Sequence, residues 1–113
     1  MSITVFKNAT LIDGTGAAPL ERGILAIEGD KILYAGAADA WQTSEGKSVN
    51  EIDLTGKTIL PGLIDCHVHI AAECLPDSTL NGPWGWTTLV MLRHAQNTLA
   101  AGITTIRDVG GRH

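Results

Sequence analysis

The sequence contains few cysteines, few aromatic residues and no long apolar run. Two cysteines among 113 residues are too few for a disulfide framework, which indicates a reducing compartment. No apolar stretch approaches the roughly 20 residues that a helix needs to cross a bilayer. Residues 1–7 also lack the cationic start and the apolar run of a signal peptide. We therefore expect a cytoplasmic protein that makes no contact with membranes.

Charged residues are also sparse, and their signs are mixed. They make up 18% of the chain, the formal net charge is −4, and 44% of the residues are hydrophobic. These values are typical of one small globular domain. Because the sequence has no basic patch, nucleic acid is not expected as a partner.

The first 60 residues have the pattern of a β-rich module with short strands and tight turns. Gly29-Asp30 separates two runs rich in β-branched residues, which predicts a β-hairpin. Asn8 interrupts the first run, which is therefore one kinked strand or two strands. The predicted strands cover residues 3–12, 23–28, 31–36, 51–54 and 58–60. The composition changes at Pro61-Gly62, and we place a domain boundary there, between residues 1–60 and 61–113.

After this boundary the pattern predicts a strand, a helix and a second strand. The strands cover residues 63–70 and 103–109. Apolar residues at helical spacing predict the helix over 87–101, with Thr87 or Thr88 as a candidate cap at its start and Gly102 at its end. Two strands joined through a helix are expected to run parallel.

A long loop is predicted over residues 71–86, between the first of these strands and the helix. Trp84 and Trp86 in this loop are candidates to wall a substrate pocket. Packing of the loop onto the body of the protein is an equally open alternative. Cys74 in the same loop is predicted to be a free thiol.

His67 and His69 stand two residues apart at the end of the apolar strand that begins at Pro61-Gly62. Residues i and i+2 of a strand point to the same face, so the two imidazoles would lie side by side. Two converging imidazoles can chelate a metal ion, and strand C-terminal ends bind ligands in α/β proteins. The pair alone is a weak signal, and two half-exposed histidines without a metal are the alternative. Asp65 is a candidate hydrogen-bond partner for an imidazole, whereas Cys66 faces the other way and is expected to be buried.

Two further residues complete the candidates. Asp108 falls at the end of the second predicted strand, where it is a candidate for lining the site; an ion pair near the strand ends is the alternative. His94 lies on a flank of the predicted helix and is expected to be a surface or half-buried residue rather than a ligand.

The stretch from Thr55 to His69 resembles the motif around the first barrel strand of the metal-dependent amidohydrolase superfamily. Residues 8–13 and the hairpin over 27–32 are similar to the opening of the same proteins. Residues 101–111 are similar to the second barrel strand of the branch that holds imidazolonepropionase-like and Xaa-Pro dipeptidase-like enzymes. The resemblance covers nearly the whole chain.

The resemblance implies an α/β fold in which a small β-sandwich module precedes the start of a (β/α)8 TIM-type barrel. It implies that His67 and His69 are metal ligands, most often for zinc, with one or two ions bound. The family's further ligands and its proton-handling carboxylate have no counterpart in this sequence, and neither His94 nor His113 matches them. The implied activity is hydrolysis of an amide, peptide-like or cyclic amide bond of a small molecule through a metal-activated water.

One strand–helix–strand unit does not close a fold. A parallel pair needs further strands beside it and helices on both faces, so we expect the remainder of the barrel or a partner chain to complete it. The open strand edge predicts that the isolated chain forms homo-oligomers or aggregates, and that it is inactive by itself. Two other classes of function stay open. One is a non-catalytic truncated fragment or assembly subunit, and the other is a binding module in which His67 and His69 complete a site across a subunit interface.

Overall fold

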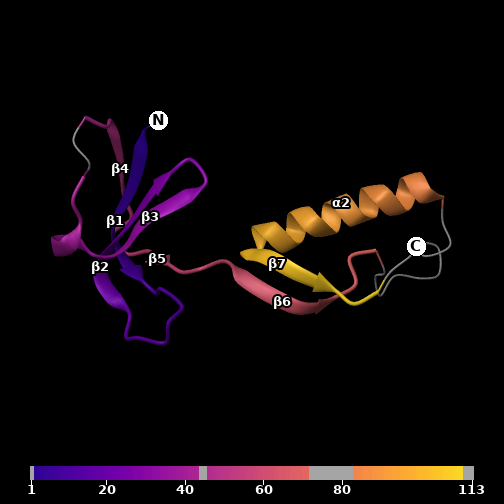
Figure 1. The fold of residues 1–113 in the computed structure, drawn as a ribbon. Coiled ribbons are helices and arrows are strands. Elements are labelled where there is room, and N and C mark those ends of the chain that lie inside the picture. Colours follow the sequence, from indigo (N-terminus) through magenta and orange to yellow (C-terminus); the bar gives the residue numbers. More distant parts are fainter. Residues whose placement is uncertain (1, 44–45, 72–82, 111–113) are drawn as a thin grey trace. The chain divides into compact units, whose positions relative to one another are not determined.

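The computed structural model describes residues 2–43, 46–71 and 83–110 (Figure 1). The chain divides into two compact units, Met1–Pro61 and Gly62–His113. The described strands and helix give a mixed α/β structure, as predicted. The β-sandwich and the barrel stay predictions, because each needs strands beyond those that the structure describes.

The first unit contains a five-stranded sheet arranged around its first strand (Figure 1). The bounds are β1 (Ile3–Leu11), β2 (Leu20–Glu28), β3 (Lys31–Ala37), β4 (Val49–Asp53) and β5 (Thr58–Ile59), with the 3-10 helix η1 (Ala38–Ala40) after β3. β1 pairs antiparallel with β2 and parallel with β4 and β5. β2 also pairs antiparallel with β3.

Two features of this sheet follow from local backbone chemistry. The β2–β3 hairpin turns at Gly29, whose φ of +60° is readily adopted by glycine, and Glu28 pairs with Lys31 across the turn. The predicted hairpin is therefore confirmed. At Asn8 the φ angle is +64° and the register between β1 and β2 shifts, so the predicted kink is a bulge within one strand.

A small hydrophobic core lies on one face of the sheet. Its buried side chains come from alternate positions of two neighbouring strands: Ile3, Val5, Ile24 and Ala26. Tyr34 and Trp41 pack against this core, and their ring centroids are 5.3 Å apart. The period of two within β1 and β2 thus separates the core face from the opposite face.

Asp53 and Asp13 each hold a turn through the same kind of hydrogen bonds. One carboxylate oxygen of Asp53 accepts bonds from the hydroxyl and the backbone N–H of Thr55 at 2.7 and 2.8 Å. Asp13 accepts bonds from the backbone N–H and the hydroxyl of Thr15 at 2.9 and 2.7 Å. These bonds stabilise the ionised form and lower the pKa of both carboxyl groups from the ordinary value of 3.8.

We expect the first unit to lose stability in acid through these two groups. A carboxyl group whose pKa is lowered by folding stabilises the fold above its unfolded pKa, and this contribution is lost as the pH falls through the folded value. The midpoint of urea unfolding should therefore fall between about pH 5 and pH 2. The fall should be smaller in a variant carrying Asp13→Asn and Asp53→Asn. An equal fall in the variant and the unchanged chain would contradict this account.

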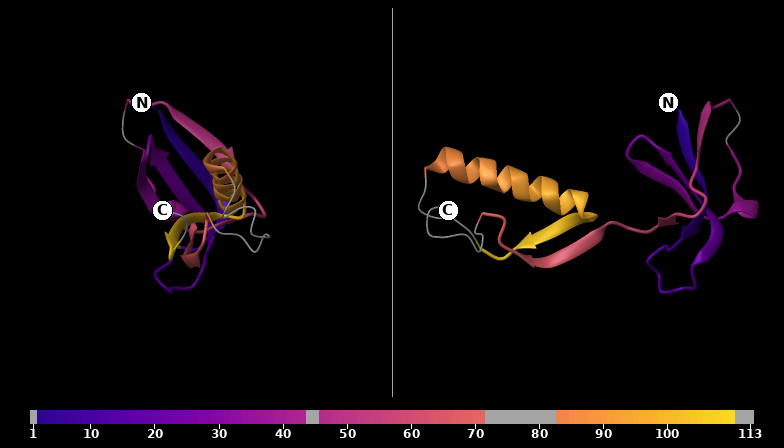
Figure 2. Two further views of the ribbon diagram at one scale, coloured as in Figure 1. Left: turned by 90° about the vertical axis from the view of Figure 1, so that its right-hand side faces the viewer. Right: turned by 180° about the vertical axis from the view of Figure 1, so that it is seen from behind.

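The second unit contains a parallel pair of strands with a helix alongside (Figure 2). β6 (Leu63–Val68) leads to α2 (Trp84–Ala100), which leads to β7 (Ile103–Asp108). The predicted order of strand, helix and strand is confirmed, as is the parallel pairing. The helix ends where Gly102 takes a φ of +86° and its N–H donates to the carbonyl of Leu99 at 3.0 Å, as predicted.

The start of α2 differs from the prediction. The helix begins at Trp84, so Trp84 and Trp86 lie on its first turn rather than in a loop. Pro83 stands at the N-cap with a φ of −56°, and no side chain caps the helix, so the predicted cap at Thr87 or Thr88 is wrong. Proline is favoured at helix starts because its φ already suits a helix and because an N–H there has no intrahelical acceptor.

Some predictions concern residues outside those that the structure describes. Residues 72–82, which include Cys74 and most of the predicted loop, are among them, and so is His113. None of the helices in the described part of the chain has the length and apolar character needed to cross a membrane.

Candidate metal centre at the ends of the parallel strands

The structure brings His67 and His69 together at the C-terminal end of β6. Their ring centroids are 5.3 Å apart, the ring planes meet at 67°, and both side chains are exposed. Imidazole nitrogens bind zinc at about 2.0–2.1 Å, so two rings at this spacing are close enough to share one ion. The pair therefore meets the first requirement of a metal site.

A β-bulge lies within the histidine strand. Asp65 pairs with Ile106 and Val68 pairs with Asp108, so two residues of β6 stand opposite Arg107 alone. The guanidinium Nε of Arg107 donates to the carbonyl of Cys66 at 2.9 Å. Bulges of this kind redirect side chains and are common beside active sites.

The imidazole of His69 is oriented by a backbone carbonyl. Its Nδ1 lies 2.7 Å from the carbonyl oxygen of Gly110. Because a carbonyl oxygen only accepts hydrogen bonds, Nδ1 carries the proton, and in the neutral ring Nε2 then presents its lone pair. Metal-ligating histidines show this arrangement, with the second ring nitrogen donating to a carbonyl or a carboxylate. The tautomer of His69 thus fits a metal ligand that binds through Nε2.

Asp108 lies at the same strand end, at the C-terminus of β7. Its two oxygens accept hydrogen bonds from the backbone N–H of Gly110 at 3.0 Å and of Ile70 at 3.2 Å. The bond from Gly110, then that from Ile70 and the neighbouring His69, lower its pKa from the ordinary value of 3.8. The ion pair considered as an alternative is not seen for Asp108 among the described residues.

Asp65 does not contact a histidine ring through the bonds that the structure shows. Its carboxylate instead accepts the backbone N–H of His67 at 3.1 Å. The imidazole of His69 is oriented by Gly110, a residue that the sequence pattern places only just after the end of a predicted strand. A carbonyl partner leaves no signal in the sequence, because every residue carries one.

The remaining candidates occupy different positions in the second unit. Trp84 and Trp86 are 55% and 56% exposed on the first turn of α2, which begins at the end of the unit where β6 and β7 finish (Figure 1). His94 is half-buried, as expected, and its Nδ1 lies 3.0 Å from the carbonyl of Ile70. Cys66 is exposed, so the prediction of a buried thiol is wrong. Its strand has little cover in the described part of the chain, where neighbouring Ile64 is 66% exposed.

Among the residues that the structure describes, the two histidines are the only part of a metal centre that is present. Within the described ranges, no group of three or more His, Cys, Asp or Glu side chains is placed to hold a metal ion. A catalytic zinc site uses about three protein ligands and keeps one position open. Further ligands are therefore needed for a complete site.

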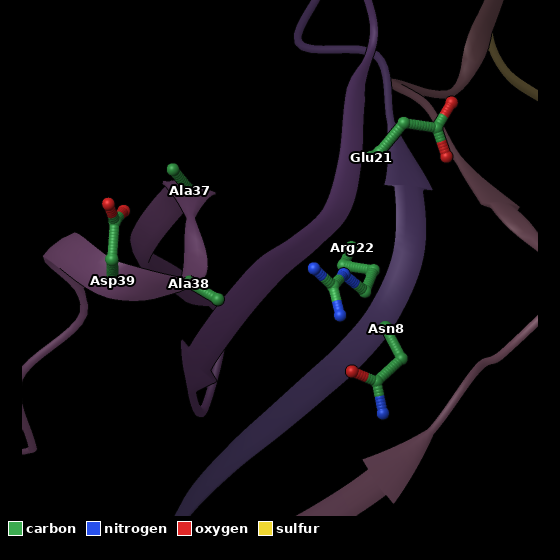
Figure 3. Close-up of a pocket in the computed structure, with 6 residues that line it drawn as sticks. All are labelled: Asn8, Glu21, Arg22, Ala37, Ala38 and Asp39. Atoms are coloured by element: carbon green, nitrogen blue, oxygen red, sulfur yellow. The ribbon is translucent and has the colours of Figure 1, made fainter.

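The first unit contains a cavity of about 380 Å³ (Figure 3). It is lined by Asn8, Glu21, Arg22, Ala37, Ala38 and Asp39. Asn8 and Arg22 have φ angles of +64° and +52°, which places the cavity at the irregular pairing of β1 and β2. No histidine or cysteine lies among its lining residues, and the predicted site residues all lie in the second unit.

Curated proteins with similar sequences are mainly enzymes of one kind. The imidazolonepropionase of Hyphomonas neptunium is 44% identical over 73 residues, which cover 58% of this chain and 18% of that protein. The imidazolonepropionase of Mesorhizobium japonicum is 38% identical over 72 residues, covering 60% of this chain and 18% of that protein. The 5-methylthioadenosine/S-adenosylhomocysteine deaminase of Symbiobacterium thermophilum is 32% identical over 76 residues, covering 66% and 17%. No family model matches the chain.

Solved structures match nearly the whole chain. An amidohydrolase aligns with a TM-score of 0.79 and 34% identity, covering 97% of this chain and 26% of that one. A prolidase complexed with N-methylphosphonate-L-proline aligns with a TM-score of 0.79 and 28% identity, covering 96% and 26%. A Xaa-Pro dipeptidase with bound methionine aligns with a TM-score of 0.75 and 30% identity, covering 96% and 27%.

Fold and relatives together support one class: the chain is similar to the N-terminal portion of amidohydrolase-superfamily proteins. Within this superfamily its relatives include imidazolonepropionases by sequence and prolidases by structure. The chain spans about a fifth of the length of these curated relatives and about a quarter of the solved chains.

Proposed function

We propose that the protein is a metal-dependent hydrolase of carbon–nitrogen bonds and that His67 and His69 are its first two metal ligands. The observation that carries this proposal is the orientation of His69, whose Nδ1 lies 2.7 Å from a carbonyl while its ring lies 5.3 Å from that of His67. The names of the relatives, imidazolonepropionase and prolidase, support a cyclic amide or peptide-like bond in a small molecule as the target.

The two histidines would supply neutral nitrogen donors, which suit zinc. A divalent ion, most often zinc and either one or two per site, would polarise the scissile carbonyl and lower the pKa of a water molecule when bound. Both imidazoles are exposed, so further ligands and the substrate would have access to their open side.

Asp108 would not act as the proton-handling group in this proposal. Both of its oxygens are already engaged by backbone N–H groups of Ile70 and Gly110. Its lowered pKa keeps it ionised at neutral pH. The exposed indoles of Trp84 and Trp86 would contribute apolar surface to the substrate pocket.

The proposed activity is tested with the protein expressed from its own gene and carrying an N-terminal tag. We expect it to hydrolyse at least one substrate among cyclic amides of the imidazolone type and Xaa-Pro dipeptides. A chelator should abolish the hydrolysis, and added zinc should restore it, because the ion polarises the scissile carbonyl. Hydrolysis that persists unchanged after the metal is removed, or no hydrolysis of either class, would contradict the proposal.

A non-catalytic assembly subunit is the second candidate. It is favoured by the absence of a third metal-binding side chain near the histidines in the described ranges. In this case zinc would bind through His67 and His69, and the same assay would show no hydrolysis.

A further inference from the structure

Asp108 joins two backbone segments that follow the parallel strands. Its Oδ2 accepts the N–H of Ile70, just after the histidine strand, and its Oδ1 accepts the N–H of Gly110, just after its own strand. The N–H of Val109 also donates to the carbonyl of Val68 at 3.0 Å. The end of β7 is thus hydrogen-bonded to the residues on both sides of His69.

Gly110 links these hydrogen bonds of Asp108 to the imidazole ring of His69. The N–H of Gly110 donates to Asp108, and the carbonyl of the same residue accepts Nδ1–H of His69 at 2.7 Å. Gly110 also has a φ of +150°, which residues with a Cβ rarely adopt. Because glycine has wide freedom in φ and ψ, the hydrogen bond that holds its N–H restricts the directions open to its carbonyl.

We infer that Asp108 is a positioning residue for His69: it fixes Gly110, and the carbonyl of Gly110 fixes the orientation and tautomer of the imidazole. As a step toward metal binding, this inference rests on the proposed function. The effect on the ring itself does not require a metal. Outer partners of metal ligands commonly change metal affinity about 10–100-fold when they are removed.

Two other aspartates show what is particular to Asp108. Asp13 and Asp53 each accept the N–H of the residue two positions ahead, as Asp108 does with Gly110. Asp108 alone of these three also accepts an N–H that lies 38 residues away in the sequence. Asp13→Ala is therefore a matched control, because it removes the same charge and the same local bond in the first unit.

The first measurement is the tautomer of His69 in the metal-free 113-residue chain, read from long-range ¹⁵N–¹H NMR correlations. The unchanged chain and Asp13→Ala should show one dominant form, protonated on Nδ1. Asp108→Ala should show exchange between both tautomers, because Gly110 is no longer held. Asp108→Asn should be intermediate, since its amide keeps one oxygen acceptor.

Gly110→Ala is a second route to the same result if Asp108→Ala does not fold. It disturbs the carbonyl through the φ of residue 110 while Asp108 stays in place. Far-UV circular dichroism shows which variants keep the fold. The inference is overturned if folded Asp108→Ala, or folded Gly110→Ala in its place, keeps the dominant Nδ1–H form of the unchanged chain.

The second measurement is zinc affinity by calorimetric titration. Asp108→Ala should weaken binding about 10–100-fold relative to Asp13→Ala. If zinc binds through the histidines but neither affinity nor tautomer changes in Asp108→Ala, the positioning role fails while the proposed function stands. If His69 exchanges between both tautomers in Asp108→Ala but the unchanged chain binds no zinc, the positioning role stands and the proposed metal site fails.

Discussion

Zinc binding by the 113-residue chain should be lost when both His67 and His69 are replaced by alanine. The two rings lie 5.3 Å apart, and no third ligand stands beside them among the described residues, so each imidazole supplies a large share of the binding energy. Each single replacement should weaken zinc binding by more than about 100-fold. This loss is larger than the roughly 10–100-fold expected when a residue that only hydrogen-bonds to a metal ligand is removed. Calorimetric titration and zinc analysis after dialysis measure both outcomes.

His94→Ala is the matched control for this experiment. His94 lies in the same unit, and its ring contacts the carbonyl of Ile70, but it is not expected to bind the ion. This variant should keep one zinc ion per chain at saturating zinc. Equal zinc binding by the unchanged chain and the His67→Ala, His69→Ala variant would remove the basis for the metal centre.

Replacement of Gly62 should give the largest loss of stability in the second unit. A Cβ atom at this position would lie 2.0 Å from Oγ1, 2.4 Å from Cγ2 and 2.7 Å from Cβ of Thr104. Glycine is therefore required by the close approach of Thr104 in the neighbouring segment. Gly62→Ala should lower the free energy of unfolding by about 1–3 kcal/mol, as overpacking does, and Gly62→Val by more. Urea unfolding followed at 222 nm reports mainly on α2 and measures the loss.

Two variants separate this close contact from a general effect of losing glycine. Gly85 lies within α2, and a Cβ atom added there would meet no atom within 4 Å, so Gly85→Ala should stabilise the helix by up to about 1 kcal/mol. Thr104→Gly combined with Gly62→Ala removes the clashing side chain and should recover part of the loss. A Gly62→Ala chain as stable as the unchanged one would show that Gly62 and Thr104 do not approach this closely.

Features that depend on near neighbours were predictable from the sequence. The hairpin turns at Gly29 and α2 ends at Gly102 because both positions have a positive φ angle, which glycine adopts readily and most other residues do not. The closeness of His67 and His69 was expected from the alternation of side chains, although β6 ends at Val68 and His69 follows it. The strand–helix–strand order of the second unit follows from hydrophobic periodicity.

Other features of the candidate site were beyond sequence reasoning. The helix begins three residues earlier than the pattern predicts, because Gly85, a residue type that disfavours helices, lies within it. The exposure of Cys66 depends on how much of the chain covers β6, and a residue pattern does not show this. The bulge opposite Arg107 depends on the register between two strands.

By itself, the sequence determined that two histidines end a strand and that an aspartate ends the next strand of a parallel pair. Only the tertiary structure decided what holds them. Asp108 reaches Ile70 across 38 residues, and His69 reaches Gly110 across 41. Local patterns specify which face a side chain occupies, whereas strand register and backbone direction specify which distant N–H or carbonyl it meets. The orientation of the proposed metal ligand therefore comes from the pairing of β6 with β7.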